Sequence, residues 1–296
     1  MPLEQGGKRS ECSKIWSDLT DRSTGWGNSD IFQSHRRIRL FTIGLLEGRM
    51  SLKVTLLGTG VGIPQPGRSQ AAILVEAEQQ LLLDCGAGTL LRLDQIGASI
   101  EAIDTVLLSH LHLDHVSDLL ALANGRYLAD MPGLEVFGPE GTEDYIRSAR
   151  RLYPNLSEMD VAVQELHPMD SLSLKDFDLF AEEATHSLPS LAFRLEAEDL
   201  VVVYSGDTEP SPRVAALAKD ADLLVHECSF PEPFDVTNHS TPKKLGSMIR
   251  DCGIKRVALT HLYPQAAGCE DQMAEQVIEL SGVPTIVGWD MMTLSL

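Results

Sequence analysis

The chain has 296 residues, of which 43% are hydrophobic and 23% are charged. That apolar share is enough to build a large core, which excludes a mostly disordered protein. No apolar run approaches the roughly 20 residues of a membrane-spanning helix, so no membrane segment is expected. With 24 Lys and Arg against 43 Asp and Glu, the net charge is −19. This acid excess disfavours broad contact with the backbone of a nucleic acid, which requires a basic surface.

Residues 1–49 differ in composition from the rest of the chain. They are rich in Ser, Gly, Arg and Asp and show no sustained hydrophobic period. We predict a disordered leader over 1–49 and one folded domain over 50–296, with Met50 as an alternative start. The five cysteines are widely spaced without a CxxC pair, and the N-terminus lacks the apolar core of a signal peptide. Both features favour a cytoplasmic protein with free thiols.

From Leu52 onward the hydrophobic pattern becomes regular. Apolar runs bounded by turn residues predict strands, and the helical patterns end at Gly97 or just before Pro154. In the first half, the expected strands are 53–60, the two arms of a hairpin over 71–83, 103–110 and 134–139. The expected helices there are 89–97, 116–128 and 142–153.

The second half continues the same alternation of strands and helices. The expected strands are 176–186, 190–196, 200–207, 221–227, 256–261, 285–290 and 293–296. The expected helices are 214–220, 242–251 and 270–280. Strands dominate both halves, with helices between them. We therefore predict an α+β fold in which two sheets pack face to face with helices outside, a four-layer αββα sandwich.

The segment HLHLDH, over 110–115, carries four side chains that can bind a metal ion. In extended backbone at a strand end, His110 and His112 point the same way, because side chains alternate with a period of two. Asp114 and His115 follow where the chain turns, so they can face a second point from a different angle. Imidazole and carboxylate groups at this density suit zinc first, with iron or manganese as alternatives. The competing interpretation is a His-rich surface turn.

Three later residues share one placement, each at the carboxyl end of an apolar strand: His186, Asp207 and His261. Loops at one edge of a sheet converge on a shared site, so these side chains are expected to join the cluster. Each alone is weak evidence, because a single histidine at a strand end is more often structural. Together with the cluster they supply five imidazoles and two carboxylates, enough ligands for two metal ions.

The cluster and these three residues resemble the metallo-β-lactamase-fold hydrolase superfamily, and the resemblance covers 51–296. It implies two Zn²⁺ ions, one held by His110, His112 and His186 and the other by Asp114, His115 and His261, with Asp207 bridging them. β-Lactamases of this superfamily lack such a bridge, whereas its phosphodiesterases and thioesterases have one, so a β-lactamase is disfavoured. Asp84, in the family-like segment LLLDCGAGT, is either a residue that supports the ligands or a plain turn aspartate.

Two further segments, HECSF at 226–230 and HST at 239–241, resemble those of the ribonuclease Z branch, which trims the 3′ end of precursor tRNA. This resemblance implies that His239 protonates the leaving oxygen, with His226 and Glu227 orienting it. It also implies that Asp114 is both a metal ligand and a proton acceptor. A purely structural role is the alternative for His226, Glu227 and His239.

The sequence departs from that branch in two respects. Cys-Ser stands where Ala-Thr is usual in the segment 226–230, which keeps a hydroxyl at Ser229. More importantly, only 20 residues separate His186 from Asp207, where most bacterial ribonuclease Z enzymes insert a Gly-, Pro- and Lys-rich arm that grips tRNA. An acidic turn at 197–199 takes its place. Neither the missing arm nor the net charge favours a large RNA substrate.

Other polar residues beside these segments have two interpretations. A hydroxyl of Ser240 or Thr241 is expected to cap the helix that begins at residue 242. Arg68, Lys243 and Lys244 are candidates for binding a substrate phosphate, although each is more often a solvated surface charge.

Our leading hypothesis is a dinuclear zinc hydrolase of the ribonuclease Z-like branch that acts on a phosphodiester, either the 3′ trailer of precursor tRNA or a smaller nucleotide or cyclic phosphodiester. The second keeps the metals but changes the bond to a thioester, a lactone or another carboxyl ester, which leaves His226, Glu227 and His239 without a role. A non-catalytic metal-binding module is the third. Members of this branch are often dimers, so analogy suggests a homodimer.

Overall fold

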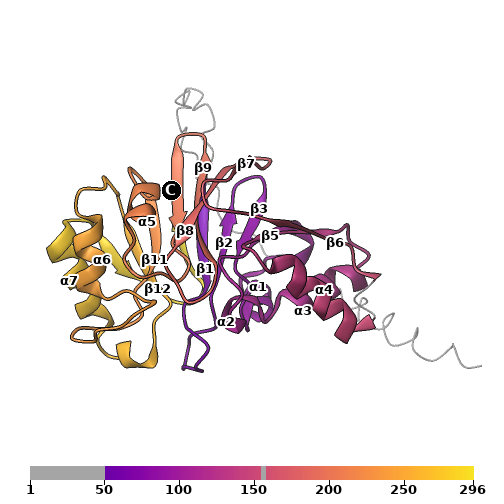
Figure 1. Cartoon of the computed structure of the whole chain (residues 1–296), viewed down its shortest axis with the longest axis horizontal. Coiled ribbons are helices and arrows are strands. Elements are labelled where there is room, and N and C mark those ends of the chain that lie inside the picture. The colour runs from indigo at the N-terminus through magenta and orange to yellow at the C-terminus, as the bar shows by residue number, and fades with distance from the viewer. Residues whose placement is uncertain (1–50, 155–157) are drawn as a thin grey trace, which may run out of the picture. The chain divides into compact units, whose positions relative to one another are not determined.

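The computed structural model of the chain describes residues 51–154 and 158–296, and the predicted leader 1–49 lies outside them. The described residues form two seven-stranded sheets that pack face to face, with helices on both outer faces (Figure 1). The predicted four-layer αββα sandwich is therefore confirmed. None of the helices in this part of the chain is long and apolar enough to cross a bilayer.

The first sheet combines the N-terminal half of the domain with the last strand of the chain. Its spatial order is β14 (Met292–Ser295), β1 (Lys53–Gly58), β2 (Ala72–Glu76), β3 (Gln80–Leu83), β4 (Ile103–Leu107), β5 (Leu134–Gly138) and β6 (Val161–Glu165). The pairs from β14 to β3 are antiparallel and those from β3 to β6 are parallel. The helices on its outer side are α1 (Thr89–Ile96), α2 (Leu113–Val116), α3 (Leu119–Leu128) and α4 (Thr142–Leu152).

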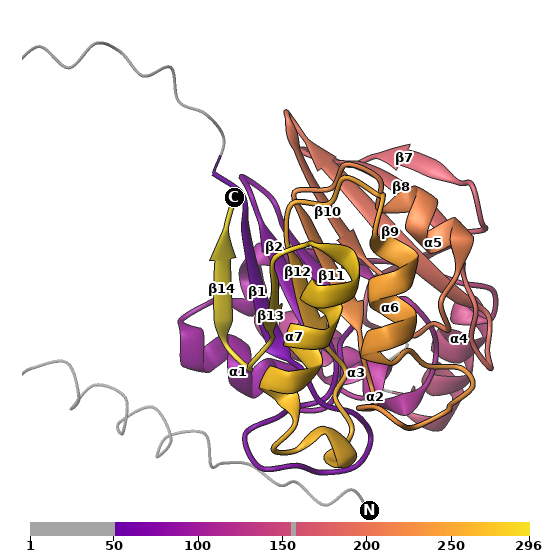
Figure 2. The ribbon, with the colours of Figure 1, turned by 90° about the vertical axis from the view of Figure 1, so that its left-hand side faces the viewer.

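The second sheet holds most of the C-terminal half. Its order is β13 (Thr285–Val287), β12 (Val257–Thr260), β11 (Leu223–Glu227), β10 (Leu200–Tyr204), β9 (Ser190–Ala197), β8 (Asp178–Ala184) and β7 (Ser171–Ser173). The four strands from β13 to β10 are parallel, and the others pair antiparallel. Figure 2 shows α6 (Pro242–Ile249) and α7 (Glu270–Ser281) in front of this sheet, and α5 (Pro212–Leu217) packs near β8 and β9.

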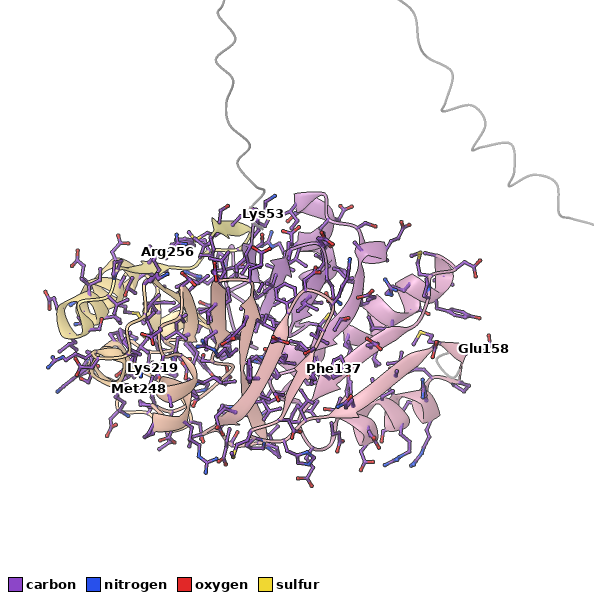
Figure 3. All side chains as sticks on the ribbon, turned by 90° about the horizontal axis from the view of Figure 1, so that it is seen from above. Lys53, Phe137, Glu158, Lys219, Met248 and Arg256 are labelled. Carbon is purple, nitrogen blue, oxygen red and sulfur yellow. The ribbon has the colours of Figure 1, made fainter. Side chains whose placement is uncertain are left out.

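Alternate residues of the strands build separate apolar layers on the two faces of each sheet. On β3, Leu81 and Leu83 pack between the sheets, whereas Leu82 packs under the helices of the first half. Phe137, near the end of β5, belongs to the layer between the sheets (Figure 3). Because strand side chains alternate with a period of two, one strand made of continuous apolar residues can contribute to both layers.

Two strands are not predicted by the sequence pattern, β6 and β7. Both lie at the edges of their sheets. Val161 is the one fully buried residue of β6, and none of β7 is fully buried. An edge strand with so few buried side chains lacks the apolar run that identifies the inner strands. The other predicted elements are present with boundaries shifted by a few residues, and the helix expected over 116–128 is α3, preceded by the short α2.

Several parallel strands deliver the site residues to one shared edge of the two sheets. Hydrogen bonds between backbone groups join the sheets there, from Leu191 N–H to Ser109 O at 2.8 Å and from Leu262 N–H to Thr59 O at 3.0 Å. Ser109 follows β4 of the first sheet, and Leu262 follows β12 of the second. Loops that leave the ends of both sheets are thereby fixed against one another, which is the arrangement that a site built from distant segments requires.

Phe193, on β9, tests the layer between the sheets because its side chain is fully buried there. We expect Phe193→Ala to lower the free energy of unfolding by about 3–5 kcal/mol, since the lost ring leaves a cavity. Leu128→Ala, at a position that is 74% exposed on α3, should change that free energy by less than about 0.5 kcal/mol. Chemical denaturation measures both variants, and an equally small effect in the two would contradict the buried position of Phe193.

Candidate active site

The histidine-rich segment lies where β4 ends and α2 begins. β4 ends at Leu107, and α2 starts at Leu113 with His112 as its N-cap residue. His110 and His112 remain in the extended chain, and His110 Nε2 lies 2.9 Å from His112 Nδ1. Asp114 and His115 lie on the first turn of the helix. The side chains of this segment therefore approach one region from two directions, as the sequence predicts.

The first group of potential ligand atoms comes from both sheets. Nδ1 of His112 lies 3.1 Å from Nε2 of His186, which follows β8. Oδ2 of Asp207, after β10, lies 3.8 Å from His110 Nε2 and 3.9 Å from His186 Nε2. One atom from each of these four residues lies within 4.8 Å of the others. The structure thus brings His110, His112, His186 and Asp207 together.

The second group lies directly beside the first. Nε2 of His261, which follows β12, lies 3.3 Å from Nε2 of His115 and 3.4 Å from Oδ2 of Asp114. Oδ2 of Asp207 is 3.5 Å from His115 Nε2 and 3.3 Å from His261 Nε2. The same oxygen of Asp207 therefore faces both groups, which is the placement that a bridging carboxylate needs.

The spacing of these atoms fits metal coordination. With Zn–N bonds of about 2.0–2.1 Å, two ligands of a tetrahedral zinc ion lie roughly 3.4 Å apart. The neighbouring atoms quoted above are 2.9–3.9 Å apart. In addition, Oδ1 of Asp207 is buried without a hydrogen-bond partner among the described residues. A cation would satisfy such an acceptor, so these side chains fit the binding of divalent metal.

The protonation of the histidines agrees with metal binding in the first group. Burial lowers the pKa of His110 well below its ordinary value, and His115 lowers it further. Burial also lowers the pKa values of His112 and His186. These three imidazoles are therefore neutral, the form that binds metals. Burial alone would lower the pKa of His115, but neighbouring carboxylates, Asp207 first, raise it well above its ordinary value, so metal binding there would release a proton.

Asp84, at the end of β3, joins the two sheets beneath the second group. Its Oδ2 accepts hydrogen bonds from His115 Nδ1 at 2.7 Å, from Tyr204 O–H at 2.7 Å and from Ser109 O–H at 2.8 Å. Its Oδ1 accepts the backbone N–H of Ser109 at 2.7 Å. The carboxylate accepts a hydrogen bond from the protonated Nδ1 of His115, so that Nε2 of this ring faces the site. Asp84 thus orients a potential ligand.

His186 is oriented in a comparable way, by a backbone group. Its Nδ1 lies 2.9 Å from the carbonyl oxygen of Asn238, so Nδ1 donates and Nε2 is left facing His112. Asn238 itself is fixed by its N–H, which donates to Glu209 Oε1 at 2.7 Å. The backbone at Asn238 has a φ of 64°, in the left-handed region, where Asn is better tolerated than most residues.

His239 follows Asn238 and lies against both groups. Its ring centroid is 5.4 Å from that of His186 and 5.5 Å from that of His261, on which it stacks. Its Nδ1 lies 3.4 Å from Glu227 Oε1 and its Nε2 lies 3.4 Å from the hydroxyl of Tyr263. Burial lowers the pKa of His239, but the hydrogen bond with Glu227 outweighs it, and the resulting pKa is raised. His239 therefore holds a proton more firmly than an isolated histidine does.

Glu227 and His226 occupy different surroundings at the end of β11. Glu227 accepts hydrogen bonds from the N–H and O–H of Ser229, at 3.0 and 2.8 Å, and from Ser240 N–H at 2.7 Å. Both residues are fully buried. His226 Nδ1 lies 2.6 Å from the carbonyl of Glu227, and its Nε2 has no hydrogen-bond partner among the described residues. Because adjacent strand residues face opposite sides, Glu227 reaches His239 and His226 does not.

The expected helix cap at Ser240 or Thr241 is wrong. Thr241 is the N-cap residue of α6, but its own side chain makes no capping hydrogen bond. The hydroxyl of Thr241 donates to Glu232 Oε1 at 2.8 Å, and that of Ser240 donates to the carbonyl of Thr208 at 3.0 Å. Glu232 in turn accepts the N–H of Lys243 at 3.2 Å. The hydroxyls hold neighbouring loops instead, because those loops bring acceptors close to them.

Arg68 is neither a solvated charge nor a free phosphate ligand. Its Nη1 donates to Thr59 Oγ1 at 2.6 Å and to the carbonyl of Gly288 at 2.8 Å, and its guanidinium lies 4.2 Å from the ring centroid of Trp289. Lys244 donates to Asp235 Oδ1 at 3.1 Å and to the carbonyl of Val236 at 2.9 Å. Both cations are used within the fold, whereas Lys243 is exposed.

The sequence pattern does not identify several groups that position the site. Tyr204 supports Asp84, and the carbonyl of Asn238 supports His186. The N–H of Gly62 donates to Oδ2 of Asp114 at 2.8 Å. A tyrosine at the end of an apolar strand and a glycine-rich loop after the first strand are the available signals, and neither is specific. A cavity of about 470 Å³ is lined by His186 and by other residues of the loops after β5, β6 and β8.

Comparison with known proteins identifies the family. The beta-lactamase superfamily domain matches residues 79–262. The chain belongs to the beta-lactamase superfamily. Ribonuclease Z of Mycobacterium marinum is 30% identical over 251 residues, which cover 75% of this chain and 90% of the relative. Ribonuclease Z of Methanosarcina mazei is 27% identical over 267 residues, which cover 71% of this chain and 87% of the relative.

Solved structures agree with this family. The short form of human tRNase Z has a TM-score of 0.68 at 25% identity and covers 82% of this chain and 98% of its own. A metallo-β-lactamase-fold protein from Bacillus subtilis has a TM-score of 0.75 at 22% identity, covering 84% of this chain and 100% of its own, and shows the shared fold. The predicted resemblance is confirmed, and the chain is a metal-dependent hydrolase of the ribonuclease Z-like branch.

The alignment with the Methanosarcina relative also bears on the missing arm. The alignment is 267 positions long, but it includes only 71% of the 296 residues of this chain, which is fewer than 267 residues. The Methanosarcina relative therefore has residues that have no counterpart in this chain. The short connection between His186 and Asp207, a hairpin of β9 and β10, agrees with this difference.

Asp84 provides a test of how the ligands are oriented. We expect Asp84→Asn to weaken zinc binding by about 10- to 100-fold, because His115 loses the charged partner that fixes its orientation. Asp290→Asn is the matched control, since Asp290 is also a largely buried carboxylate with several donors, Thr59, Ser69 and Arg92, that belong to neither ligand group. Competition with a chromogenic chelator measures the affinity. Equal weakening in both variants would show a general loss of stability instead.

Proposed function

We propose that the chain is a phosphodiesterase that binds two divalent metal ions, with zinc as the preferred metal. The observation that carries this proposal is His239, a histidine that is bound to Glu227 and stacks on His261 beside both ligand groups. A phosphodiester releases an alkoxide, which leaves poorly unless it is protonated or bound to a cation. A thioesterase with the same ligands has less need of such a group, because a thiolate leaves without a proton.

We assign the metal ions to the two groups described above, one to His110, His112 and His186 and one to Asp114, His115 and His261, with Asp207 between them. Two such ions stabilise the negative charge of the attacking and leaving oxygens and lower the pKa of water. Asp114 is only partly buried, and Gly62 N–H holds the same oxygen that faces His261, so this carboxylate is positioned to accept a proton. Its charge is retained because His261 and His115 hold its pKa below the usual value, against the effect of burial.

His239 is assigned the role of the proton donor to the leaving oxygen. Glu227 accepts from Nδ1 and favours the protonated ring, so Nε2 carries the proton that is transferred. Glu227 is a positioning residue, fixed in turn by Ser229 and Ser240. His226 faces away from His239, and we assign it a structural role at the end of β11.

We favour a short nucleotide phosphodiester over a precursor tRNA as the substrate. The relatives named ribonuclease Z support the phosphodiester chemistry. Against a long polyanion stand the net charge of −19 and the absence of an arm between His186 and Asp207. The hairpin that replaces the arm carries Glu198 and Asp199 at its turn, which would repel phosphate groups.

Metal content and substrate class are tested together. The protein loaded with Zn²⁺ or Mn²⁺ is expected to hold about two ions per chain and to hydrolyse bis(p-nitrophenyl) phosphate. A chelator should abolish the activity, and metal should restore it. Metal analysis and the absorbance of p-nitrophenolate are the readouts. Hydrolysis of a thioester or lactone panel without any on the diester would favour a carboxyl-ester hydrolase, and two bound ions with no turnover would favour a binding module.

The role of His239 is tested with two leaving groups. We expect His239→Ala to lower kcat by about 10²–10⁴-fold on the dinucleotide adenylyl-adenosine, whose alkoxide needs a proton. On bis(p-nitrophenyl) phosphate the loss should stay below about tenfold, because p-nitrophenolate leaves without one. His167→Ala, at an exposed histidine, serves as the control. Equal losses on the two substrates would contradict proton donation by His239.

A further inference from the structure

Two aromatic side chains, Tyr263 and Phe230, lie beside His239, and a third, Phe234, packs against Phe230. The ring of Phe230 stacks on that of Tyr263, with centroids 4.4 Å apart and planes at 27°. Phe234 lies 5.6 Å from Phe230. The centroid of His239 is 5.3 Å from that of Tyr263 and 6.1 Å from that of Phe230. We call Phe230, Phe234 and Tyr263 the aromatic platform.

The platform is notable against the composition of the chain, in which aromatic residues make up only 5%. Its members come from two segments that reach the same edge: Phe230 and Phe234 lie in the loop between β11 and α6, and Tyr263 follows β12. Phe234 is 43% exposed, and the other two are partly exposed. The structure therefore presents flat apolar surface to solvent directly beside the proposed proton donor.

The loop that carries Phe234 is held in place at several points. Glu232 accepts from Thr241 O–H at 2.8 Å, and Lys244 donates to Asp235 Oδ1 at 3.1 Å. The N–H of Asn238 closes the loop on Glu209 at 2.7 Å. A ring held in this way is available for a partner at little cost in conformational entropy, unlike a ring on an unattached loop. The contacts also engage Lys244 internally, so recognition at this loop rests on stacking more than on charge.

Stacking favours planar partners. Aromatic side chains accept flat rings in offset or edge-to-face arrangements, and every nucleobase offers such a face. A leaving oxygen that takes a proton from His239 must lie within hydrogen-bond reach of its imidazole. The remainder of the leaving alcohol would then lie beside His239, near the rings of Tyr263 and Phe230.

We propose that the aromatic platform binds the nucleobase of the nucleoside that leaves as an alcohol, so that Phe234 determines substrate specificity. This inference rests on the proposed phosphodiesterase function. It narrows the substrate to a phosphodiester with a planar, nucleoside-like leaving group and predicts that the base on the other side of the phosphate contributes less.

The experiment compares adenylyl-adenosine with two abasic counterparts, each lacking one base, and product analysis identifies the nucleoside that leaves as the alcohol. In the wild-type protein, loss of the leaving base should lower kcat/KM by roughly tenfold or more, and loss of the other base should lower it less. In Phe234→Ala, kcat/KM for adenylyl-adenosine should fall to about the value for the substrate without the leaving base. Phe234→Leu, which keeps apolar volume without a flat face, should behave in the same way.

Tyr127→Ala is the matched control, because Tyr127 is 41% exposed on α3, in the helix layer of the other half of the domain. It should keep the wild-type preference for the leaving base. Equal rates on the two abasic substrates, or an equal loss on all substrates in the Phe234 variants, would overturn the platform while leaving the phosphodiesterase intact. Failure of the wild-type protein to cleave any of these diesters would overturn both proposals.

Discussion

The carboxylate of Asp207 is buried, and a single one of its oxygens lies 3.3–3.9 Å from ring nitrogens of four histidines. An anion in such a place is costly unless cations surround it, and burial alone would raise its pKa. The histidines instead hold that pKa well below its usual value, His261 most strongly. The position of Asp207 therefore imposes an electrostatic constraint on the fold. Positive charge must lie around its carboxylate, and the residues that provide or bind this charge come from loops that are far apart in the sequence. Divalent metal ions bound here would supply this charge without requiring that the imidazoles carry protons.

This requirement explains why both sheets must meet at one edge. Asp207 follows β10 of the second sheet, whereas His110 and His115 follow β4 of the first. Gly206 has a φ of 56°, and a Cβ atom there would lie only 2.8 Å from Cβ of Ser109, so the two loops approach too closely for a larger residue. Asp84 and Tyr204 add a hydrogen bond of 2.7 Å between the sheets. The packed layer between the sheets and the polar contacts at its end therefore hold the two sheets in the same position relative to each other.

The sequence predicts the elements with strong apolar patterns and the residues that follow them. The segment HLHLDH can be identified from the sequence because four potential ligands lie close together along the chain. The other three, His186, Asp207 and His261, can be identified because each follows an apolar strand. Contacts between segments that are far apart in the sequence cannot be predicted from such local patterns. Arg68 donates to the carbonyl of Gly288, and the hydroxyl of Thr241 donates to Glu232, although local rules favour a solvated surface charge and a helix cap. The assignment of each ligand to a metal ion stays a prediction, as do the leader and the homodimer.

The acidic charge and the proposed chemistry are compatible because they act over different distances. At about 0.1 M salt, surface charges are screened over roughly 10 Å, so the net charge of −19 acts chiefly on a polyanion that lies along the surface. A short diester meets only the charges beside Asp207, where two bound dications would outweigh the nearby carboxylates. A long RNA would have to offset repulsion at each phosphate outside the site without a basic arm to help. On the proposed function, the electrostatics would thus select substrates by length, and the rings beside His239 would select them by shape.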